Sequence, residues 1–430
     1  MLFAFMGKKT KMIEMRKINP FVHWWMAPNL PKEHIYIPLE KRPKGLYQKL
    51  RLYLRKWIVH PIKRRMAKYY LLFLQRYFGI IVIAITGSAG KTTTKEMLAS
   101  ILRLKGKTVA SYKNIDPVYN IPMTILKCRP GTRYLVLELG VEYPGEMEFY
   151  CWLVKPNIGI ITNIYPTHIQ FFGSIKGVAN EKENLIRHLP KSGFAILNRD
   201  NKYLRNFANK VKVKVIWYGK GCEISAENSA LTSNMRTRFV LVIKESKINI
   251  HLPMIGNQFV ENALAAASAA RVLGINLKQI KKGLENYEKP EHRMNVIKLR
   301  SGALLVDDSY NNNPEAAKKS LRTFKEIAGN KETIVVFGDM LELGNFEKEY
   351  HRQLGELISS LGFNFLIGVG ELSKNTVEIA GKKLKKNRLF WVGSEGEVDA
   401  ILKPLLKKHR AVLVKGSRSI GLDNLVSRLS

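Results

Sequence analysis

The chain of 430 residues is long enough for two or three domains, and its apolar content of 46% is ordinary for a globular protein. The formal net charge of +36, from 71 Lys and Arg against 35 Asp and Glu, favours polyanionic partners unless it reflects only a lysine-rich proteome. Three widely spaced cysteines exclude a disulfide framework, no apolar run approaches the ~18 residues of a membrane span, and the start MLFAFM is too short for a signal peptide.

Residues 1–79 differ in composition from the rest of the chain. Five prolines interrupt residues 20–43, and from Lys41 to Arg76 there are twelve Lys or Arg and no acid, interleaved with apolar residues. This pattern predicts a basic, partly helical segment with two helical pieces broken near Pro61. Two binding surfaces remain open for the segment: an anionic membrane, which it would bind without spanning, or the next domain.

Residues 80–290 alternate strand and helix signals, which is typical of a mostly parallel sheet covered on both faces. Predicted strands are 80–86, 108–112, 133–139, 157–163, 193–198 and 213–218, and predicted helices are 91–105, 145–153, 175–188 and 258–273. Residues 235–253 predict an appended antiparallel hairpin. Residues 291–430 predict a second, doubly wound α/β domain, with strands at 302–307, 332–337, 363–369, 388–392 and 411–414.

The stretch IIVIAITGSAGKTTTKEM, residues 80–97, combines a buried strand, a glycine turn and the start of a helix. Glycines let backbone N–H groups approach an anion, and the helix N-terminus adds positive potential. The pattern predicts a phosphate-binding loop in which Lys91 reaches the outer phosphates and Thr92 is a ligand of Mg²⁺. A glycine expected at position 85 is Ile85, so a chance glycine turn is the alternative. The predicted nucleotide contacts are Gly87, Ser88, Ala89, Gly90, Lys91, Thr92 and Thr93.

Further motifs follow this loop along the chain. They are LVLELGVEYPGEME (135–148), ITNIYPTHIQFFGSIKGVANEKENLI (161–186), GNQFVENALAAASAARVLG (256–274), PEHRM (290–294), DDSYNNNP (307–314), VVFGDMLELG (335–344) and LVKGSRSIG (413–421). In this order they resemble the Mur ligase family of ATP-dependent amide ligases, over about residues 80–430, and most closely its MurF type. The resemblance implies a P-loop central domain over 80–290 and a C-terminal, Rossmann-like α/β domain over 291–430.

In that family a peptide carboxylate attacks the γ-phosphate of ATP, and an incoming amine then displaces phosphate from the acyl phosphate. The resemblance implies that the chain adds D-alanyl-D-alanine to a muramyl tripeptide in peptidoglycan precursor synthesis. The first alternative is the same chemistry on another acid and amine, in another muramyl-peptide step, a pseudomurein-type peptide or polyglutamate. The second is a basic nucleotide-binding module that contacts nucleic acid, which no stacking-aromatic RNA motif supports.

The resemblance also implies two Mg²⁺ sites and catalytic roles for Lys91, His168 and Lys182. Thr92 and Glu138 hold the first ion; Glu138 closes a buried strand, where a carboxylate needs a cation, unless the strand end is solvated. His168 holds the second ion, with a structural histidine as its alternative. Lys182 corresponds to a lysine that the family carbamylates, which replaces a repelling ammonium by an anionic oxygen ligand. A plain surface lysine is the alternative for Lys182.

The nucleotide contacts implied in the second half of the chain come from both domains. Asn262 meets the adenine ring, Arg293 the ATP phosphates across the cleft, and Asp308 the ribose. An interdomain ion pair is the alternative for Arg293. The resemblance further implies contacts with the nucleotide or the substrate for Asn311, Asn313, Lys415 and Arg418. A solvated charge is the alternative for Lys415 and Arg418.

Family members of the MurF type carry an α/β domain before the phosphate loop, which holds the UDP-sugar. Residues 1–79 show no strand–helix alternation, so we expect no such domain in this segment. The expected partners are the nucleotide, the muramyl-peptide and dipeptide substrates and, through 41–76, an anionic membrane surface; nucleic acid is not expected. The expected protein is a cytoplasmic monomer, with peripheral attachment to the inner face of the membrane as an open interpretation.

Overall fold

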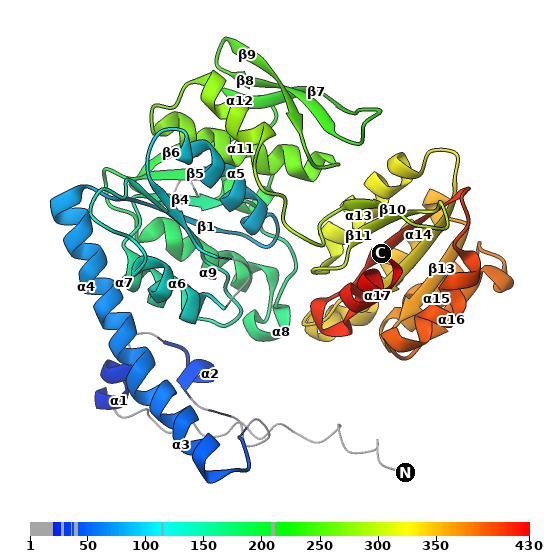
Figure 1. The fold of residues 1–430 in the computed structure, drawn as a ribbon, viewed down its shortest axis with the longest axis horizontal. Helices are drawn as coiled ribbons and strands as arrows, with labels where there is room; N and C mark the ends of the chain where they lie inside the picture. The colour runs from blue at the N-terminus through cyan, green and yellow to red at the C-terminus, as the bar shows by residue number, and fades with distance from the viewer. Residues whose placement is uncertain (1–19, 27–29, 36, 38–41, 113–115, 208–210) are drawn as a thin grey trace.

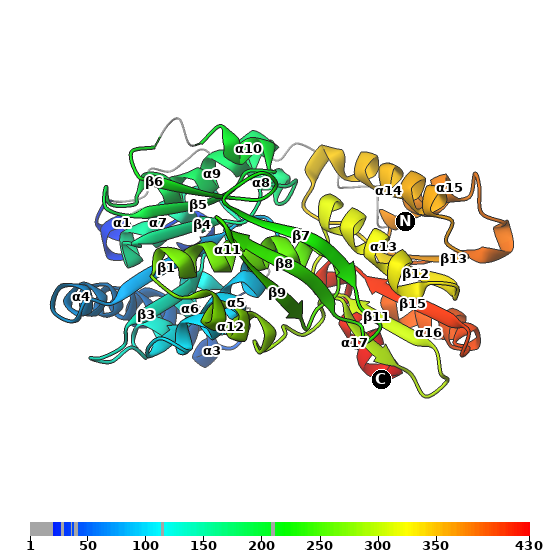
Figure 2. The same cartoon turned by 90° about the horizontal axis from the view of Figure 1, so that it is seen from above.

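The computed structural model describes residues 20–26, 30–35, 37, 42–112, 116–207 and 211–430. Two α/β bodies lie side by side, and a helical arm extends from the first of them (Figures 1 and 2). Residues 1–19, 27–29, 36 and 38–41 of the predicted N-terminal segment lie outside the described residues. Among the described helices, none combines the length and the apolar composition that crossing a bilayer requires.

The N-terminal arm is built around one long helix, which continues through Pro61. The predicted break near Pro61 is therefore wrong. Pro61 lies in the first turn of α4, where proline is tolerated, and the irregularity is a wider π-turn before it. The elements of the arm are α1 (Pro20–Met26), α2 (Lys32–Ile35), α3 (Leu46–Leu54), the π-turn η2 (Arg55–Val59) and α4 (His60–Phe78).

The first body contains, within the described residues, a nine-stranded sheet of order β2-β3-β1-β4-β5-β6-β7-β8-β9. Neighbours pair in parallel from β2 to β7, and β7, β8 and β9 pair antiparallel. The predicted hairpin is β8 and β9, whereas β7 was missed because ISAENSAL lacks an apolar alternation. The strands are β1 (Ile81–Thr86), β2 (Thr108–Ala110), β3 (Tyr134–Glu138), β4 (Ile158–Ile161), β5 (Phe194–Asn198), β6 (Lys214–Tyr218), β7 (Ile224–Leu231), β8 (Thr237–Ile243) and β9 (Ser246–Leu252).

Helices cover both faces of this sheet, and the side chains of β1 alternate between them. Ile83 and Ile85 pack in the core that α5, α11 and α12 complete, while Val82 and Ala84 pack in the core of α4, α6, α7 and α9. This double burial is typical of parallel sheets and explains the continuous apolar run of β1. The helices are α5 (Lys91–Arg103), α6 (Pro117–Ile125), α7 (Glu146–Val154), α8 (Ile169–Phe172), α9 (Ile175–Arg187), α10 (Lys202–Arg205), α11 (Asn257–Val272) and α12 (Leu277–Glu285).

The second body holds a sheet of order β10-β11-β15-β12-β13-β14, parallel except for the β10–β11 pair. The sequence did not predict β10, a four-residue edge strand. The strands are β10 (Asn295–Lys298), β11 (Leu304–Asp308), β12 (Glu332–Gly338), β13 (Phe365–Val369), β14 (Leu389–Val392) and β15 (Arg410–Lys415). The helices are α13 (Pro314–Ala328), α14 (Glu347–Leu361), α15 (Ser373–Ala380), α16 (Val398–Leu402) and α17 (Leu422–Leu429), with 3₁₀ turns η4 (Gly344–Phe346), η5 (Lys386–Arg388), η6 (Glu395–Glu397), η7 (Lys403–Leu405) and η8 (Arg418–Ile420).

The carboxyl ends of strands from both sheets meet at the junction of the two bodies. Glu138 at the end of β3, Asp308 at the end of β11 and Lys415 at the end of β15 line one cavity. Ligands of α/β proteins bind at this edge of a sheet. The fold therefore directs the search for a site to the junction.

Candidate active site

The phosphate loop lies between β1 and α5, at the carboxyl end of the first sheet. Gly90 is the N-cap of α5 and has φ +80°, a left-handed conformation that strains any residue with a side chain. A Cβ on Gly90 would also overlap the Asn262 side chain, and a Cβ on Gly87 would overlap the Thr162 hydroxyl. Both glycines are therefore required by close packing as well as by the backbone.

Asn163 holds the loop in place. Its Oδ1 accepts from the Ala89 N–H at 2.8 Å, and its carbonyl accepts from the Ser88 N–H at 3.0 Å. These bonds use the amide groups of Ser88 and Ala89, so anion binding falls mainly to the first turn of α5, where helical N–H groups have no partner within the helix. Sequence reasoning missed Asn163, although it lies in the motif ITNIYPTH.

Lys91, Thr92 and Glu138 converge beside the loop. Lys91 Nζ donates to the Gly87 carbonyl at 3.0 Å. The pKa of Lys91 is lowered, because the effect of burial outweighs the opposing effect of the Glu138 carboxylate. Thr92 Oγ1 donates to Glu138 Oε1 at 3.1 Å, whereas Glu138 Oε2 is buried without a hydrogen-bond partner in the described part of the chain. Such an oxygen beside a hydroxyl fits Mg²⁺ that takes its other ligands from phosphate and water.

A cavity of about 260 Å³ joins this loop to the second body. Most of the nucleotide contacts expected from the sequence line it, and Gly87 lies in the loop behind it. Asn262, for which the sequence predicts an adenine contact, packs its side chain against Gly90. The predicted residues along its wall are Ser88, Ala89, Gly90, Lys91, Thr92, Thr93, Glu138, Asn262, Arg293, Asp308, Asn311, Asn313 and Lys415.

Lys415 and Asp308 form an ion pair at the far wall of this cavity. Their side chains are 2.7 Å apart, Lys415 Nζ also donates to the Asn311 carbonyl at 3.0 Å, and the residue is only 1% exposed. The alternative of a solvated charge is therefore wrong for Lys415. The pair fixes the start of the DDSYNNNP segment against β15 through Asp308 Oδ2, and Asp308 Oδ1 is a second acceptor on a residue that lines the cavity.

Tyr310 contacts two arginines. The guanidinium carbon of Arg293 is 4.4 Å from its ring centroid, that of Arg418 is 5.4 Å away, and Arg418 Nη1 donates to the hydroxyl at 3.5 Å. Arg293 Nε is buried and has no hydrogen-bond partner among the described residues. Arg293 is thus stacked on Tyr310 and presents its guanidinium to the cavity. Sequence reasoning did not single out Tyr310, although it lies in the motif DDSYNNNP.

His168 lies in an adjoining cavity of about 560 Å³ rather than beside Glu138. It is the N-cap of α8 with φ +55°, and its Nδ1 is 2.5 Å from Glu342 Oε2 of the second body. This hydrogen bond lowers the pKa of Glu342. Within the described residues no group of three His, Cys, Asp or Glu side chains could hold a metal ion. The role of His168 in binding a second metal stays a prediction.

Lys182 lies on α9 and is 1% exposed, so the alternative of a surface lysine is wrong. Burial, with a smaller contribution from the charge of Lys91, lowers the pKa of Lys182 to about 7. It does not line either cavity described above. Its neighbour Glu181 accepts from two N–H groups at the start of α7, those of Gly145 at 3.1 Å and Met147 at 2.8 Å.

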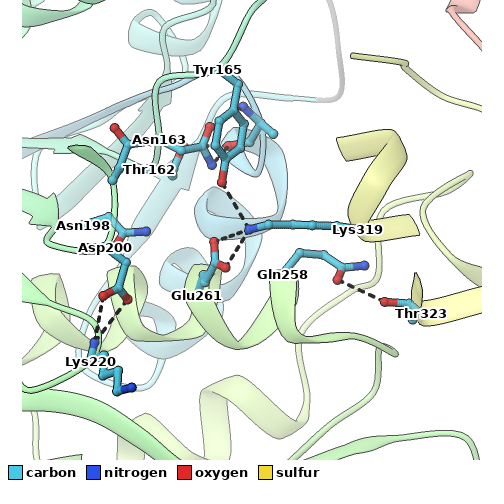
Figure 3. A network of polar contacts seen from close by, with 12 residues as sticks. Thr162, Asn163, Tyr165, Asn198, Asp200, Lys220, Gln258, Glu261, Lys319 and Thr323 are labelled. Carbon is cyan, nitrogen blue, oxygen red and sulfur yellow. Dashed lines mark hydrogen bonds and ion pairs between the residues drawn. The ribbon is translucent and has the colours of Figure 1, made fainter. Parts of the chain in front are cut away.

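A polar network joins the two bodies on another side of the cavity (Figure 3). Lys319 of α13 donates to both carboxylate oxygens of Glu261 on α11, at 2.6 and 2.8 Å, and to the Tyr165 hydroxyl at 3.1 Å. Burial alone would lower the pKa of Lys319, but the Glu261 carboxylate raises it. Sequence reasoning missed this network, because its residues lie on separate elements and form no motif.

A phosphate loop that is closed over by a second α/β body can hold a nucleotide and react it with a further substrate away from bulk water. The chain is therefore a two-domain nucleotide-binding enzyme. Comparison with known families gives its class: residues 85–270 match the Mur ligase middle domain, and residues 292–418 match the Mur ligase, glutamate ligase domain. The chain belongs to the Mur ligase family, as its motifs predict.

Relatives within the family are similar over most of the chain. A UDP-N-acetylmuramoyl-tripeptide–D-alanyl-D-alanine ligase of Buchnera aphidicola is 36% identical over 81% of this chain and 75% of its own, and that of Escherichia coli is 32% identical over 81% and 76%. The crystal structure of MurF from Acinetobacter baumannii covers 86% of this chain and 80% of its own, with a TM-score of 0.77 and 29% identity. MurF from Thermotoga maritima in complex with ADP covers 86% and 83%, with a TM-score of 0.76 and 25% identity.

These comparisons confirm the predicted fold class, a P-loop domain followed by a second α/β domain. They also confirm the prediction of a ligase. A pseudomurein peptide ligase of Methanothermus fervidus, at 20% identity and a TM-score of 0.63, shares the fold alone. The comparisons therefore favour the MurF type over the first alternative that the sequence left open.

Proposed function

We propose that the protein uses ATP to join D-alanyl-D-alanine to UDP-N-acetylmuramoyl-tripeptide, with release of ADP and phosphate. The observation that carries this proposal is the cavity between the glycine loop and the DDSYNNNP segment, which suits a nucleoside triphosphate held from two sides. The relatives named for this reaction, at 32 and 36% identity, support the choice of substrates.

In the first step the terminal carboxylate of the tripeptide attacks the γ-phosphorus of ATP, forming an acyl phosphate and releasing ADP. In the second, the dipeptide amine attacks the acyl carbon, loses a proton, and expels inorganic phosphate. Lys91 and the amides at the start of α5 neutralise the phosphate oxygens, and Arg293 adds a positive charge from the other side. Positioning and charge neutralisation carry most of the work in such transfers.

The remaining contacts orient the nucleotide. We propose that Asn262 binds the adenine ring, that Asp308 and Asn311 bind the ribose end, and that Thr92 and Glu138 hold Mg²⁺. A Mg²⁺ held there would supply charge neutralisation to the phosphates. Lys182, with its lowered pKa, is suited to carry a carbamate, because only a neutral amine reacts with CO₂. His168 and this carbamate would serve a second Mg²⁺.

We propose three parts for the chain: a basic N-terminal segment over 1–79, a central ATP-binding domain over 80–290 and a C-terminal domain over 291–430. We further propose a cytoplasmic monomer whose N-terminal segment attaches peripherally to an anionic membrane. The matches to two family domains at 85–270 and 292–418 support the division.

An ADP-release assay with candidate acids and amines added singly and together tests the reaction. We expect release only when the tripeptide substrate and the dipeptide are both present, and a product whose mass is the sum of the two minus water. Lys91→Ala should lower the rate by roughly 1,000-fold, while Lys105→Ala, which removes an exposed lysine after α5, should not. Release with another acid and amine would select the alternative substrates, and release with nucleic acid alone would contradict a ligase.

A further inference from the structure

The long N-terminal helix exposes a continuous apolar stripe. Its members are spaced by four or seven residues, so they lie along one face of α3, η2 and α4. The π-turn takes up an extra residue and keeps the two α-helical parts of the stripe in line. Leu46 at one end is 84% exposed, and Tyr77 at the other is 72% exposed. Between them the stripe contains Leu50, Leu54, Ile58, Ile62, Met66 and Phe73, all exposed.

The opposite face of α4 is fixed to the first body, whereas α3 and η2 bury no residue. Ala67, Leu71 and Leu74 are buried in the core that also contains β1 and α7, and the Tyr70 hydroxyl donates to the Cys128 carbonyl of the first body at 2.8 Å. Packing onto the next domain, one of the two surfaces that the sequence left open, therefore accounts for this face only. Because the helix is anchored in this way, it cannot turn its apolar stripe inward.

Cations flank the stripe, and acids are absent from the helix. Residues 46–78 contain nine Lys or Arg and no Asp or Glu. Since a helix turns about 100° per residue, Arg51, Arg55 and Lys63 border one side of the stripe, and Lys49 and Arg76 border the other. All five are exposed. An apolar strip between two rows of cations complements acyl chains beneath anionic headgroups.

We infer that α3, η2 and α4 form an in-plane binding surface for an anionic lipid bilayer. The stripe enters the boundary of the acyl region, and the flanking cations contact headgroup phosphates, along a helix about 50 Å long. A second copy of the chain is a poor occupant, because two basic helices of a protein with net charge +36 repel each other. This inference specifies the proposed peripheral attachment and does not depend on the ligase reaction.

Co-sedimentation of the full chain with vesicles tests the surface. The chain should pellet with vesicles of phosphatidylglycerol and phosphatidylcholine at low salt, less at high salt, and not with phosphatidylcholine alone. Leu50→Gln with Ile58→Gln should lower the partition coefficient by at least about 10-fold, because two apolar side chains no longer enter the bilayer. Phe346→Gln, a half-exposed position on the second body, is the matched control and should change nothing.

A second pair of variants tests the cations. Arg51→Gln, Arg55→Gln and Lys63→Gln together should lower the partition coefficient by up to about 100-fold. Lys382→Gln, Lys383→Gln and Lys385→Gln remove the same charge from the second body and should have little effect.

Three results would overturn the inference: equal pelleting of the parent and the stripe variant, equal binding to neutral vesicles, or a dimer of the parent that the stripe variant abolishes. Circular dichroism and the vesicle-free ADP-release assay should show that each variant is folded. If the parent itself releases no ADP, that result concerns the proposed reaction, since pelleting is measured without substrates.

Discussion

Burial of an amine favours its neutral form in the folded chain, and Lys182 is an example in this protein. Burial and the charge of Lys91 lower its pKa to about 7, whereas an unfolded lysine has a pKa of 10.5. Near neutral pH the folded protein therefore contains a substantial share of neutral amine at this position. That form is the one that carbamylation would require.

We expect Lys182→Met to be more stable than the parent below pH 7, and the difference to shrink as the pH rises to 10.5. Between these values the unfolded chain keeps the proton that the folded chain has released, so the stability of the parent rises with pH by up to about 1.4 kcal/mol per unit relative to the variant. Denaturant titration across this pH range, in bicarbonate-free buffer, measures the difference. The exposed Lys176→Met on the same helix is the control, and parallel pH profiles of Lys182→Met and the parent would refute the expectation.

At the scale of elements, Gly90 in the loop between β1 and α5 is required for two separate reasons. Gly90 has a positive φ, and a Cβ there would overlap the Asn262 side chain. Gly131 also has a positive φ, but nothing lies within 4 Å of the position of a Cβ. Substitutions at Gly131 and Gly90 can therefore separate the effect of backbone strain from the effect of steric overlap.

Gly131→Ala should lower the free energy of unfolding by roughly 1 kcal/mol, the cost of a left-handed residue. Gly90→Ala should cost more, because Asn262 must move, and should also weaken ADP binding by displacing the first turn of α5. Denaturant unfolding and ADP titration of both variants measure the two effects. Equal losses of stability in both variants, with unchanged ADP affinity, would show that the Asn262 contact is unimportant.

The elements that sequence patterns predicted are those whose burial is regular. β1 and α5 follow from an apolar run, two glycines and a helix start that all lie within 18 residues. The sequence patterns did not predict β10 or the π-turn η2. A four-residue edge strand is too short for a periodic signal, and a single residue added to a helical turn leaves none. The contact of His168 with Glu342 was not predicted either, since the two residues are 174 positions apart and only the assembled fold brings them together.

For the whole molecule, the arrangement of the two domains depends on a few polar contacts around the cavity. The ion pair of Lys319 with Glu261 crosses the junction, and both side chains are partly screened from solvent. If it helps to hold the closed arrangement, its loss lowers the population that can bind nucleotide, and the apparent affinity falls with that population.

Lys319→Met and Glu261→Gln should each weaken ADP binding by roughly fivefold, and the double variant should be little worse than either, with a coupling of about 1 kcal/mol. Isothermal titration of ADP to the four proteins measures the cycle. Lys318→Met is the control, because Lys318 pairs with Glu315 within α13 and does not cross the junction. Independent, additive losses in the double variant would exclude the pair as a link between the domains.

The cavity at the junction also determines how the protein melts. Because its wall comes from both α/β bodies, a bound nucleotide adds its binding free energy only when both are folded, about 2.7 kcal/mol at a hundredfold excess over the dissociation constant. If either body unfolds alone, the binding free energy of the nucleotide is lost. Saturating ADP should therefore raise the cooperativity of unfolding, so that a calorimetric scan narrows toward a single transition whose van't Hoff enthalpy approaches the calorimetric enthalpy of the whole chain.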